Sequence, residues 1–276
     1  MFYPHLPFAE YRKLPGNSIS NLKELDKSPL KYKHRLANPF ESAAMNLGSA
    51  THTAVLEPDL MAREYMIFDG TRRGKEWEAF QTVAQAAGKK ILKADEYALA
   101  LAMRDAVRGY EPAMKYLRRG EAEVSMTWTD ADLGIPCRGR IDWLADLDGE
   151  PVLVGLKTAR DGRHFKFGAA AFSLGYHLQW AYYLDGFHAL TGKSPKVVEI
   201  VVENTAPHEP AVYVIPDEIL DLGRDEYRRL LVKLQECESL NSWPPSLDDE
   251  EPLSFPTYAY RGLGDDSDLS DLDLTA

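Results

Sequence analysis

Asp142 and Lys157 are the first pair of residues in this sequence whose types and spacing could do chemistry. They lie on two strand-like runs separated by Asp148 and Gly149, a dipeptide typical of a two-residue β-hairpin turn. A carboxylate can hold a divalent cation, and a nearby lysine can place positive charge on a phosphate or an attacking water. The hairpin is therefore a candidate metal site.

Counting back from the turn predicts which residues face each other. Asp142 is expected directly opposite Gly155, and Arg140 opposite Lys157, so that these four residues and Arg138 share one face. Directly paired residues have Cβ atoms roughly 4.5 to 5.5 Å apart, which suits two carboxylates sharing one cation. Position 155 is a glycine, however, so the second carboxylate is missing. The other face is expected to be a core face, formed by Ile141, Trp143, Val152, Val154 and Leu156.

The same face has a simpler explanation. It could be the solvated side of a hairpin, with Asp142 balanced by two arginines. An aspartate followed at a distance by a lysine is a weak motif, so the pattern alone leaves both explanations open.

The bulk composition indicates an ordinary globular α/β protein. The chain has 276 residues, 45% of them hydrophobic and 27% charged. It has no run of eighteen apolar residues and no signal-peptide order at its N-terminus, which predicts a cytoplasmic protein without a membrane partner. Cys137 and Cys237 are too far apart in sequence to indicate a disulfide framework or a zinc site.

The net charge of −11 is concentrated at one end of the chain. Residues 245–276 hold nine acids against one base, so the rest is nearly balanced and can still present a basic face. We expect one domain over 1–244 and an acidic, disordered tail over 245–276. The tail could be a solubilising end or could recruit a partner.

Periodicity predicts a mixed central β-sheet flanked by helices, with a mainly helical part over 1–120 and a sheet core with a closing helix over 121–244. The expected elements are a helix over 17–35 broken at Ser28-Pro29, a buried helix ending before Pro58, two or three amphipathic helices ending at Gly120, a three-strand meander, a helix over 175–192, two strands and a helix over 217–240.

Several stretches, in order, resemble the PD-(D/E)XK nuclease superfamily, and specifically the RecE-type exonuclease VIII domain, a relative of bacteriophage lambda exonuclease and the RecB nuclease domain. They run from about residue 17 to 190 and are SISNLKELDKSPLKYK, LGSATHTAVLEP, EAEVSMTW, CRGRID, VLVGLKTA and YHLQWAYYLDG. The resemblance implies a restriction-endonuclease-like core, Mg²⁺ or Mn²⁺ as cofactor, and 5′-to-3′ degradation of duplex DNA ends in recombination or phage DNA metabolism. It also implies a ring-shaped homo-oligomer, and a single-strand annealing protein is a candidate partner.

The resemblance also implies roles for individual residues. These are His52 at the metal site, Glu123 as an accessory acid, Asp142 as the primary metal carboxylate, Leu156 as a backbone-carbonyl ligand, Lys157 as the catalytic lysine, and Gln179 and Tyr183 as residues lining the DNA. Each has an ordinary alternative as a core histidine, a strand-surface charge or a helix-boundary residue.

Basic side chains near the lysine are candidates for DNA binding. Such side chains release counterions from DNA, so beside an active site they form a natural phosphate track. The candidates are Arg138, Arg140, Arg160, Arg163 and Lys166.

Gly155 occupies the position of the family's (D/E), and three explanations remain open. The chain could be an inactivated nuclease, or it could be active with a displaced acid, for which Glu123 is the best candidate. It could also be a DNA-end-binding or scaffold protein that has dropped catalysis. If 155 is the lost ligand, Gly155→Asp or Gly155→Glu should raise degradation of linear duplex DNA.

Overall fold

A mixed β-sheet forms the centre of the molecule in the computed structural model, which describes residues 1–38, 43–247 and 250–254. Among these residues the sheet has seven strands in the order β1–β5–β6–β7–β8–β9, with β2 paired to β6. The strands are β1 (Phe2–Tyr3), β2 (Asn17–Ser18), β5 (Gly120–Thr129), β6 (Pro136–Leu147), β7 (Glu150–Ala159), β8 (Lys196–Glu203) and β9 (Pro210–Val214). β5, β6 and β7 form the predicted antiparallel meander, and β8 runs parallel to β7. The predicted mixed sheet is therefore confirmed.

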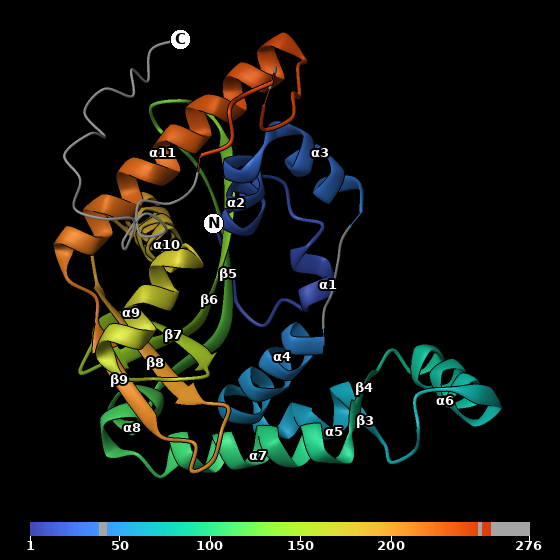
Figure 1. Ribbon diagram of the computed structural model, residues 1–276. Helices are drawn as coiled ribbons and strands as arrows, with labels where there is room; N and C mark the ends of the chain where they lie inside the picture. The colour runs from blue at the N-terminus through green and yellow to red at the C-terminus, as the bar shows by residue number, and fades with distance from the viewer. Residues whose placement is uncertain (39–42, 248–249, 255–276) are drawn as a thin grey trace, which may run out of the picture.

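Helices precede the meander, cross over between its last strand and β8, and close the chain. They are α1 (Phe8–Tyr11), α2 (Ile19–Lys27), α3 (Pro29–Ala37), α4 (Ala43–Leu56), α5 (Met61–Glu64), α6 (Gly74–Ala86), α7 (Ala94–Arg108), α8 (Glu111–Leu117), α9 (His164–Ser173), α10 (Tyr176–Thr191) and α11 (Asp217–Leu240). A separate strand pair, β3 (Tyr65–Phe68) and β4 (Lys90–Lys93), lies beside α6, which projects from one side of the molecule (Figure 1).

The sequence predicted most of these helices but misplaced one boundary and did not predict α1, α5 and α9. The last N-terminal helix ends at Leu117, and Gly120 begins β5 instead of ending a helix. A Cβ at Gly120 would meet the Leu144 carbonyl oxygen at 2.5 Å, so glycine is needed there by close strand packing. α9 was not predicted, because its basic first turn was interpreted as a phosphate track.

The break between α2 and α3 shows how local chemistry sets the helix boundaries. Pro29 cannot continue α2 but suits the first turn of α3. The Ser28 hydroxyl accepts a hydrogen bond from the Lys31 N–H at 3.1 Å and so caps α3.

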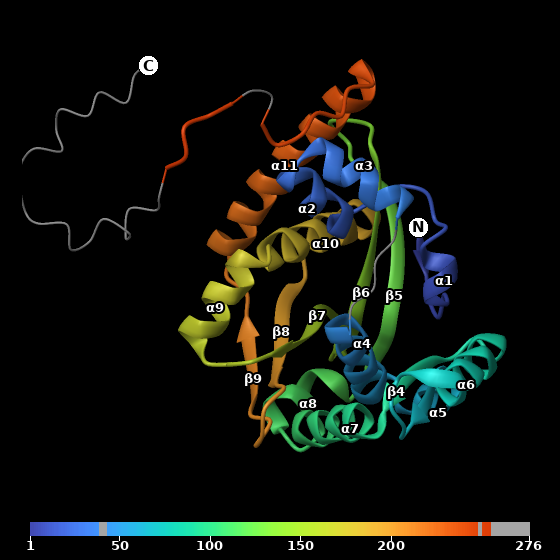
Figure 2. The ribbon, with the colours of Figure 1, turned by 45° about the vertical axis from the view of Figure 1, so that its right-hand side comes forward.

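Both faces of the sheet are buried. One face packs against α4, α7 and α8 through a core that includes Val154, Leu156 and Ile200. The other face packs against α9 and α10 through a core that includes Leu153 and Val201. α2, α3 and α11 pack on α10 and form a further layer on this side (Figure 2).

The β6–β7 hairpin has the predicted register, but its ladder is shorter than predicted. Pairing runs from Leu147–Glu150 to Trp143–Val154 and the recorded ladder ends there. Beyond that point β6 continues to pair with β5 and, at Cys137 and Arg138, with β2. Arg140 lies opposite Ser125 on β5, and the ladder with β7 does not reach Lys157.

The predicted core face of the hairpin is correct except for Ile141. Trp143 packs with Val154 on the α7 side, whereas Ile141 lies in the core on the α10 side. The change of side falls at Asp142, where β6 leaves β7.

Some predictions concern residues outside this description. Residues 248–249 and 255–276, most of the predicted acidic tail, are not described.

Cys137 and Cys237 are buried and free. Within the described ranges, no helix is long and apolar enough to cross a membrane.

Leu231→Ala tests the core beneath α11. Leu231 is 0% exposed, so we expect a loss of about 2 to 5 kcal/mol in the free energy of unfolding, measured with urea. Leu222→Ala on the same helix is the matched control, because Leu222 is 44% exposed and should cost much less. Equal losses would contradict this packing.

Candidate active site

Asp142 and Lys157 meet at the point where β6 and β7 separate. The Asp142 Oδ2 atom accepts a hydrogen bond from the Leu156 N–H at 2.9 Å and lies 3.2 Å from Lys157 Nζ. Both side chains are nearly buried, at 12% and 13% exposure. The Leu156 carbonyl oxygen lies 3.3 Å from Lys157 Nζ, so the predicted backbone ligand is at the same place.

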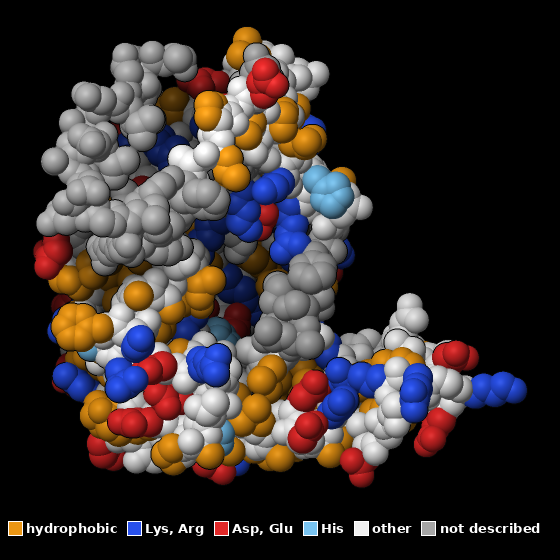
Figure 3. Space-filling view, viewed as in Figure 1, with side chains coloured by type: hydrophobic (Ala, Val, Ile, Leu, Met, Phe, Trp, Pro, Cys, Tyr) orange, Lys and Arg blue, Asp and Glu red, His pale blue; other side chains and the backbone are white. Residues whose placement is uncertain are grey.

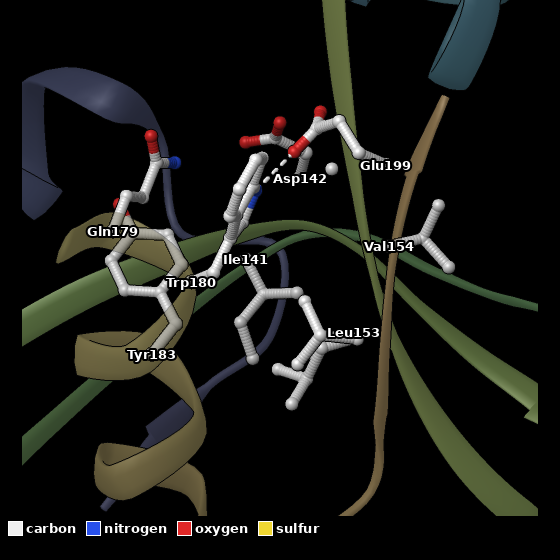
Figure 4. Close-up of a pocket in the computed structure, with 10 residues that line it drawn as sticks. Ile141, Asp142, Leu153, Val154, Gln179, Trp180, Tyr183 and Glu199 are labelled. Atoms are coloured by element: carbon white, nitrogen blue, oxygen red, sulfur yellow. Dashed lines mark hydrogen bonds between the residues drawn. The ribbon is translucent and has the colours of Figure 1, made fainter. Parts of the chain in front are cut away.

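A second carboxylate, from Glu199, lies beside this pair. Glu199 is in the middle of β8, next to Gly155 in the parallel ladder, and it is 0% exposed. The indole N–H of Trp180 donates to its Oε2 atom, and its Oε1 atom lies 3.8 Å from Lys157 Nζ. Oε1 has no hydrogen-bond partner. Figure 4 shows the Asp142 and Glu199 carboxylates directed toward each other, with the Trp180 ring beside them.

His52 and Glu123 complete the charged cluster from the opposite side. His52, on α4, has its Nδ1 atom 3.9 Å from Glu123 Oε1 and 4.0 Å from Asp142 Oδ2. Glu123 also binds the Arg140 guanidinium. The structure therefore brings together four predicted site residues, His52, Glu123, Asp142 and Lys157.

The electrostatics of the cluster follow from burial and close opposite charges. Burial alone would raise the pKa of Asp142, but Lys157 and His52 outweigh it and lower that pKa. For Lys157, burial opposes the charge, yet Asp142 and Glu199 raise its pKa. Burial raises the pKa of Glu199, and Lys157 only partly offsets this. Burial would likewise lower the pKa of His52, but Asp142 and Glu123 raise it.

A small pocket lies between the carboxylates and α10. It is lined by Asp142, Gly155 and Glu199 from the sheet and by Gln179, Trp180 and Tyr183 from α10, among others. It holds about 20 Å³ of space open to a water-sized sphere, which is room for one water or one ion. Gln179 and Tyr183 thus line the pocket, and Figure 4 shows both on α10. Their contact with DNA stays a prediction.

Arg138 and Arg140 have a different role from the one predicted. Arg138 donates to the carbonyl oxygens of Arg12 and Leu14, and Arg140 donates to that of Leu6 and to Glu123. Their guanidinium groups also lie over the Tyr11 ring. Both arginines hold the N-terminal segment against the sheet, so the prediction that they form an open DNA surface is corrected.

The other basic candidates lie at the surface near the start of α9. Arg160, Arg163 and Lys166 are exposed, and Arg163 pairs with Asp161 at 2.6 Å. Figure 3 shows a hollow between α2–α3 and α4 in which Lys, Arg, His and acidic side chains are visible.

Four residues at the site were not identified from the sequence: Glu199, Trp180, Tyr176 and Lys23. Glu199 lies within the strand run KVVEIVVEN, where an acid flanked on both sides by β-branched residues was the available signal. The ammonium groups of Lys23 and Lys157 lie 5.4 and 5.5 Å from the ring centre of Tyr176. Burial beside Lys157 lowers the pKa of Lys23 to about 8.

The donor set fits a divalent cation. In the described part of the chain, no three His, Cys, Asp or Glu side chains form a ready-made metal site, because the Lys157 ammonium lies between the two carboxylates. Yet the buried Glu199 Oε1 atom lacks a partner and the pocket has space for one ion. Oxygen donors of this kind are those that Mg²⁺ prefers.

The mixed sheet and the Asp142–Lys157 hairpin define a restriction-endonuclease-like core of the PD-(D/E)XK superfamily. The chain belongs to the family described as a PDDEXK-like domain of unknown function (DUF3799), whose model matches residues 18–250.

Solved structures support the fold. A presumed exonuclease from Eubacterium rectale is similar with a TM-score of 0.60 and 14% identity, over 92% of this chain and 94% of that one. A second structure, SSO0001, gives a TM-score of 0.30 at 15% identity, over 76% of this chain and 84% of that one, too low to carry an argument. No curated protein gives a significant match.

Arg140→Met tests the structural role of this arginine. Because Arg140 is 12% exposed and its loss leaves the Glu123 charge unpaired, we expect a loss of about 3 kcal/mol of unfolding free energy without DNA. Arg160→Met, at an exposed position, should stay within about 0.5 kcal/mol. If both variants are as stable as the wild type in urea, the corrected role is wrong.

His52→Gln tests the charged cluster through pH. The folded-state pKa of His52 is raised, so the stability from its proton is fully present below the ordinary value of about 6.5 and is lost as pH rises through the folded value. In the presence of a chelator, the wild type should therefore lose its advantage over His52→Gln as the pH rises above about 6.5. Parallel stability curves for the two proteins would contradict this.

Proposed function

We propose that this protein is a metal-dependent nuclease of the exonuclease VIII type, which degrades duplex DNA from its ends in the 5′-to-3′ direction. One observation carries the proposal: Asp142 and Lys157 meet at 3.2 Å, beside the buried Glu199 carboxylate, which has one oxygen without a hydrogen-bond partner. Membership of a PDDEXK-like family supports it.

The chain's own groups have distinct tasks in this proposal. Asp142 and the adjacent Leu156 carbonyl would hold Mg²⁺ or Mn²⁺. Such an ion supplies a water of lowered pKa and positive charge on the phosphate. The Lys157 ammonium, which here neutralises Asp142, would turn toward the phosphate and stabilise the negative charge that develops there. His52, which lies 4.0 Å from Asp142 and 3.9 Å from Glu123, would hold the Asp142 carboxylate in place, and Glu123 would hold His52.

Residues around the pocket would position the DNA. Gln179 and Tyr183 line the pocket from α10, and Lys23 lies near the Tyr176 ring, as Lys157 does. The exposed Arg160 and Lys166 extend the positive charge along the start of α9. Basic side chains beside the site would bind the phosphate backbone through counterion release.

The resemblance supports further parts of the proposal. These are a ring-shaped homo-oligomer around DNA, a single-strand annealing protein as partner, and a role in recombination or phage DNA metabolism. A second candidate function, DNA-end binding without catalysis, is favoured by the absence of a side chain at Gly155.

Asp142→Asn and Lys157→Ala test the proposed activity. With Mg²⁺ and end-labelled linear duplex DNA, Lys157→Ala should lose about 10²- to 10³-fold in rate, and Asp142→Asn should fall to background. Asp148→Asn in the exposed hairpin turn is the matched control and should retain the wild-type rate.

The position of the label reports the direction of degradation, and closed circular duplex DNA should remain intact. A wild-type protein that binds DNA ends but releases no nucleotides would support the non-catalytic candidate instead. Activity that survives Asp142→Asn would place the active site elsewhere.

A further inference from the structure

Gly155 is a glycine because another side chain fills the space beside it. A Cβ built on residue 155 would lie 2.4 Å from Glu199 Oε2, 2.5 Å from Oε1 and 2.7 Å from Cδ. No real Cβ tolerates contacts this short. Because Glu199 is fixed by Trp180 and buried by the surrounding core, its carboxylate cannot easily move away.

The Glu199 carboxylate occupies the space that the side chain of an acid at position 155 would need. Both of its oxygens and its Cδ atom lie within 2.7 Å of the Cβ that residue 155 lacks. The adjacent strand therefore brings a carboxylate into the space next to Gly155, in the pocket that Asp142 also lines.

The surroundings of Glu199 are not those of a structural acid. A buried carboxylate is costly unless its oxygens are paired, and a structural one accepts several hydrogen bonds. Glu199 has one, from Trp180, and its other oxygen lacks a partner and lies 3.8 Å from the Lys157 ammonium. Glu199 lines the small pocket together with Asp142.

Other acids near the hairpin are already engaged or too far along it. Glu123 is bound to Arg140, and Asp146 is paired with Arg119 at 3.0 Å. Glu150 is 79% exposed. Glu199 is therefore a better candidate for the displaced acid than Glu123, which the sequence suggested.

We propose that Glu199 supplies the second metal carboxylate of this site in place of an acid at position 155. The cation ligands would then come from β6 and β8 instead of from β6 and β7. This inference rests on the proposed function and deepens it: Gly155 makes room for the ligand and does not mark a dead site.

Metal binding provides the first test. Mn²⁺ binding to the full-length protein is measured by calorimetry and by the electron paramagnetic resonance signal of free Mn²⁺. Glu199→Gln keeps the size of the side chain and an acceptor for Trp180, and it should weaken Mn²⁺ binding about 100-fold or more. Glu203→Gln, four residues along β8, is the matched control and should match the wild type. Unchanged Mn²⁺ affinity in Glu199→Gln would overturn the inference.

Exchanging the two positions provides the second test. Glu199→Ala removes the atoms that clash with a Cβ at 155, so the double variant Glu199→Ala/Gly155→Asp should regain at least about tenfold in Mn²⁺ affinity over Glu199→Ala. Gly155→Asp alone should weaken binding, because two acids cannot occupy one space. If Gly155→Asp alone strengthens Mn²⁺ binding and Glu199→Gln changes nothing, position 155 is the missing ligand.

Thermal melting in chelator checks that each variant is folded, and degradation of linear duplex DNA is measured alongside. Mn²⁺ binding that depends on Glu199 in a wild-type protein that degrades no DNA would refute the proposed function and leave this inference standing. Degradation that needs Asp142 but not Glu199 would do the reverse.

Discussion

The contact of one lysine with two buried carboxylates is the constraint on which the site depends. Asp142 and Glu199 come from strands on either side of β7, and both lose most of their hydration in the folded protein. Two such charges repel each other, and Lys157 on the strand between them supplies the compensating charge. A cation that binds here must neutralise the same two carboxylates, so Lys157 and the cation have the same electrostatic role.

The geometry of β6 makes this arrangement possible. The strand leaves β7 at Asp142 and continues along β5, which frees the Leu156 N–H to bind the Asp142 carboxylate instead of a β6 carbonyl. Where the two strands separate, the Asp142 side chain, and not the backbone of β6, binds the backbone of β7. α10 then covers this point and contributes Trp180, which fixes the second carboxylate.

Much of the fold could be predicted from the sequence because its signals are local. The Asp148-Gly149 turn fixed the register of the hairpin, and Ser28-Pro29 marked the boundary between two helices. The end of the β6–β7 ladder was not predictable in this way, because it depends on the tertiary contacts of β6 with β5 and β2. Ile141 was accordingly assigned to the wrong side of the sheet.

The site was predictable only where the residues are close in sequence. Asp142 and Lys157 belong to one hairpin, whereas Glu199 reaches them only through the parallel pairing of β7 with β8 across two intervening helices. Arginine side chains are long and can turn either toward solvent or along the sheet, so alternation could not show that Arg138 and Arg140 bind the N-terminal segment. Such assignments require tertiary contacts.

The close approach of Glu199 to Gly155 has a consequence for how this site can change over generations. An acid at 155 and an acid at 199 exclude each other sterically. Moving the acid from one position to the other takes two replacements. The protein with only one of them has either two crowded acids or none. The residues at positions 155 and 199 are therefore expected to co-vary among relatives. A sequence with glycine two residues before the lysine should therefore be judged together with the neighbouring strand before it is classed as a degenerate relative.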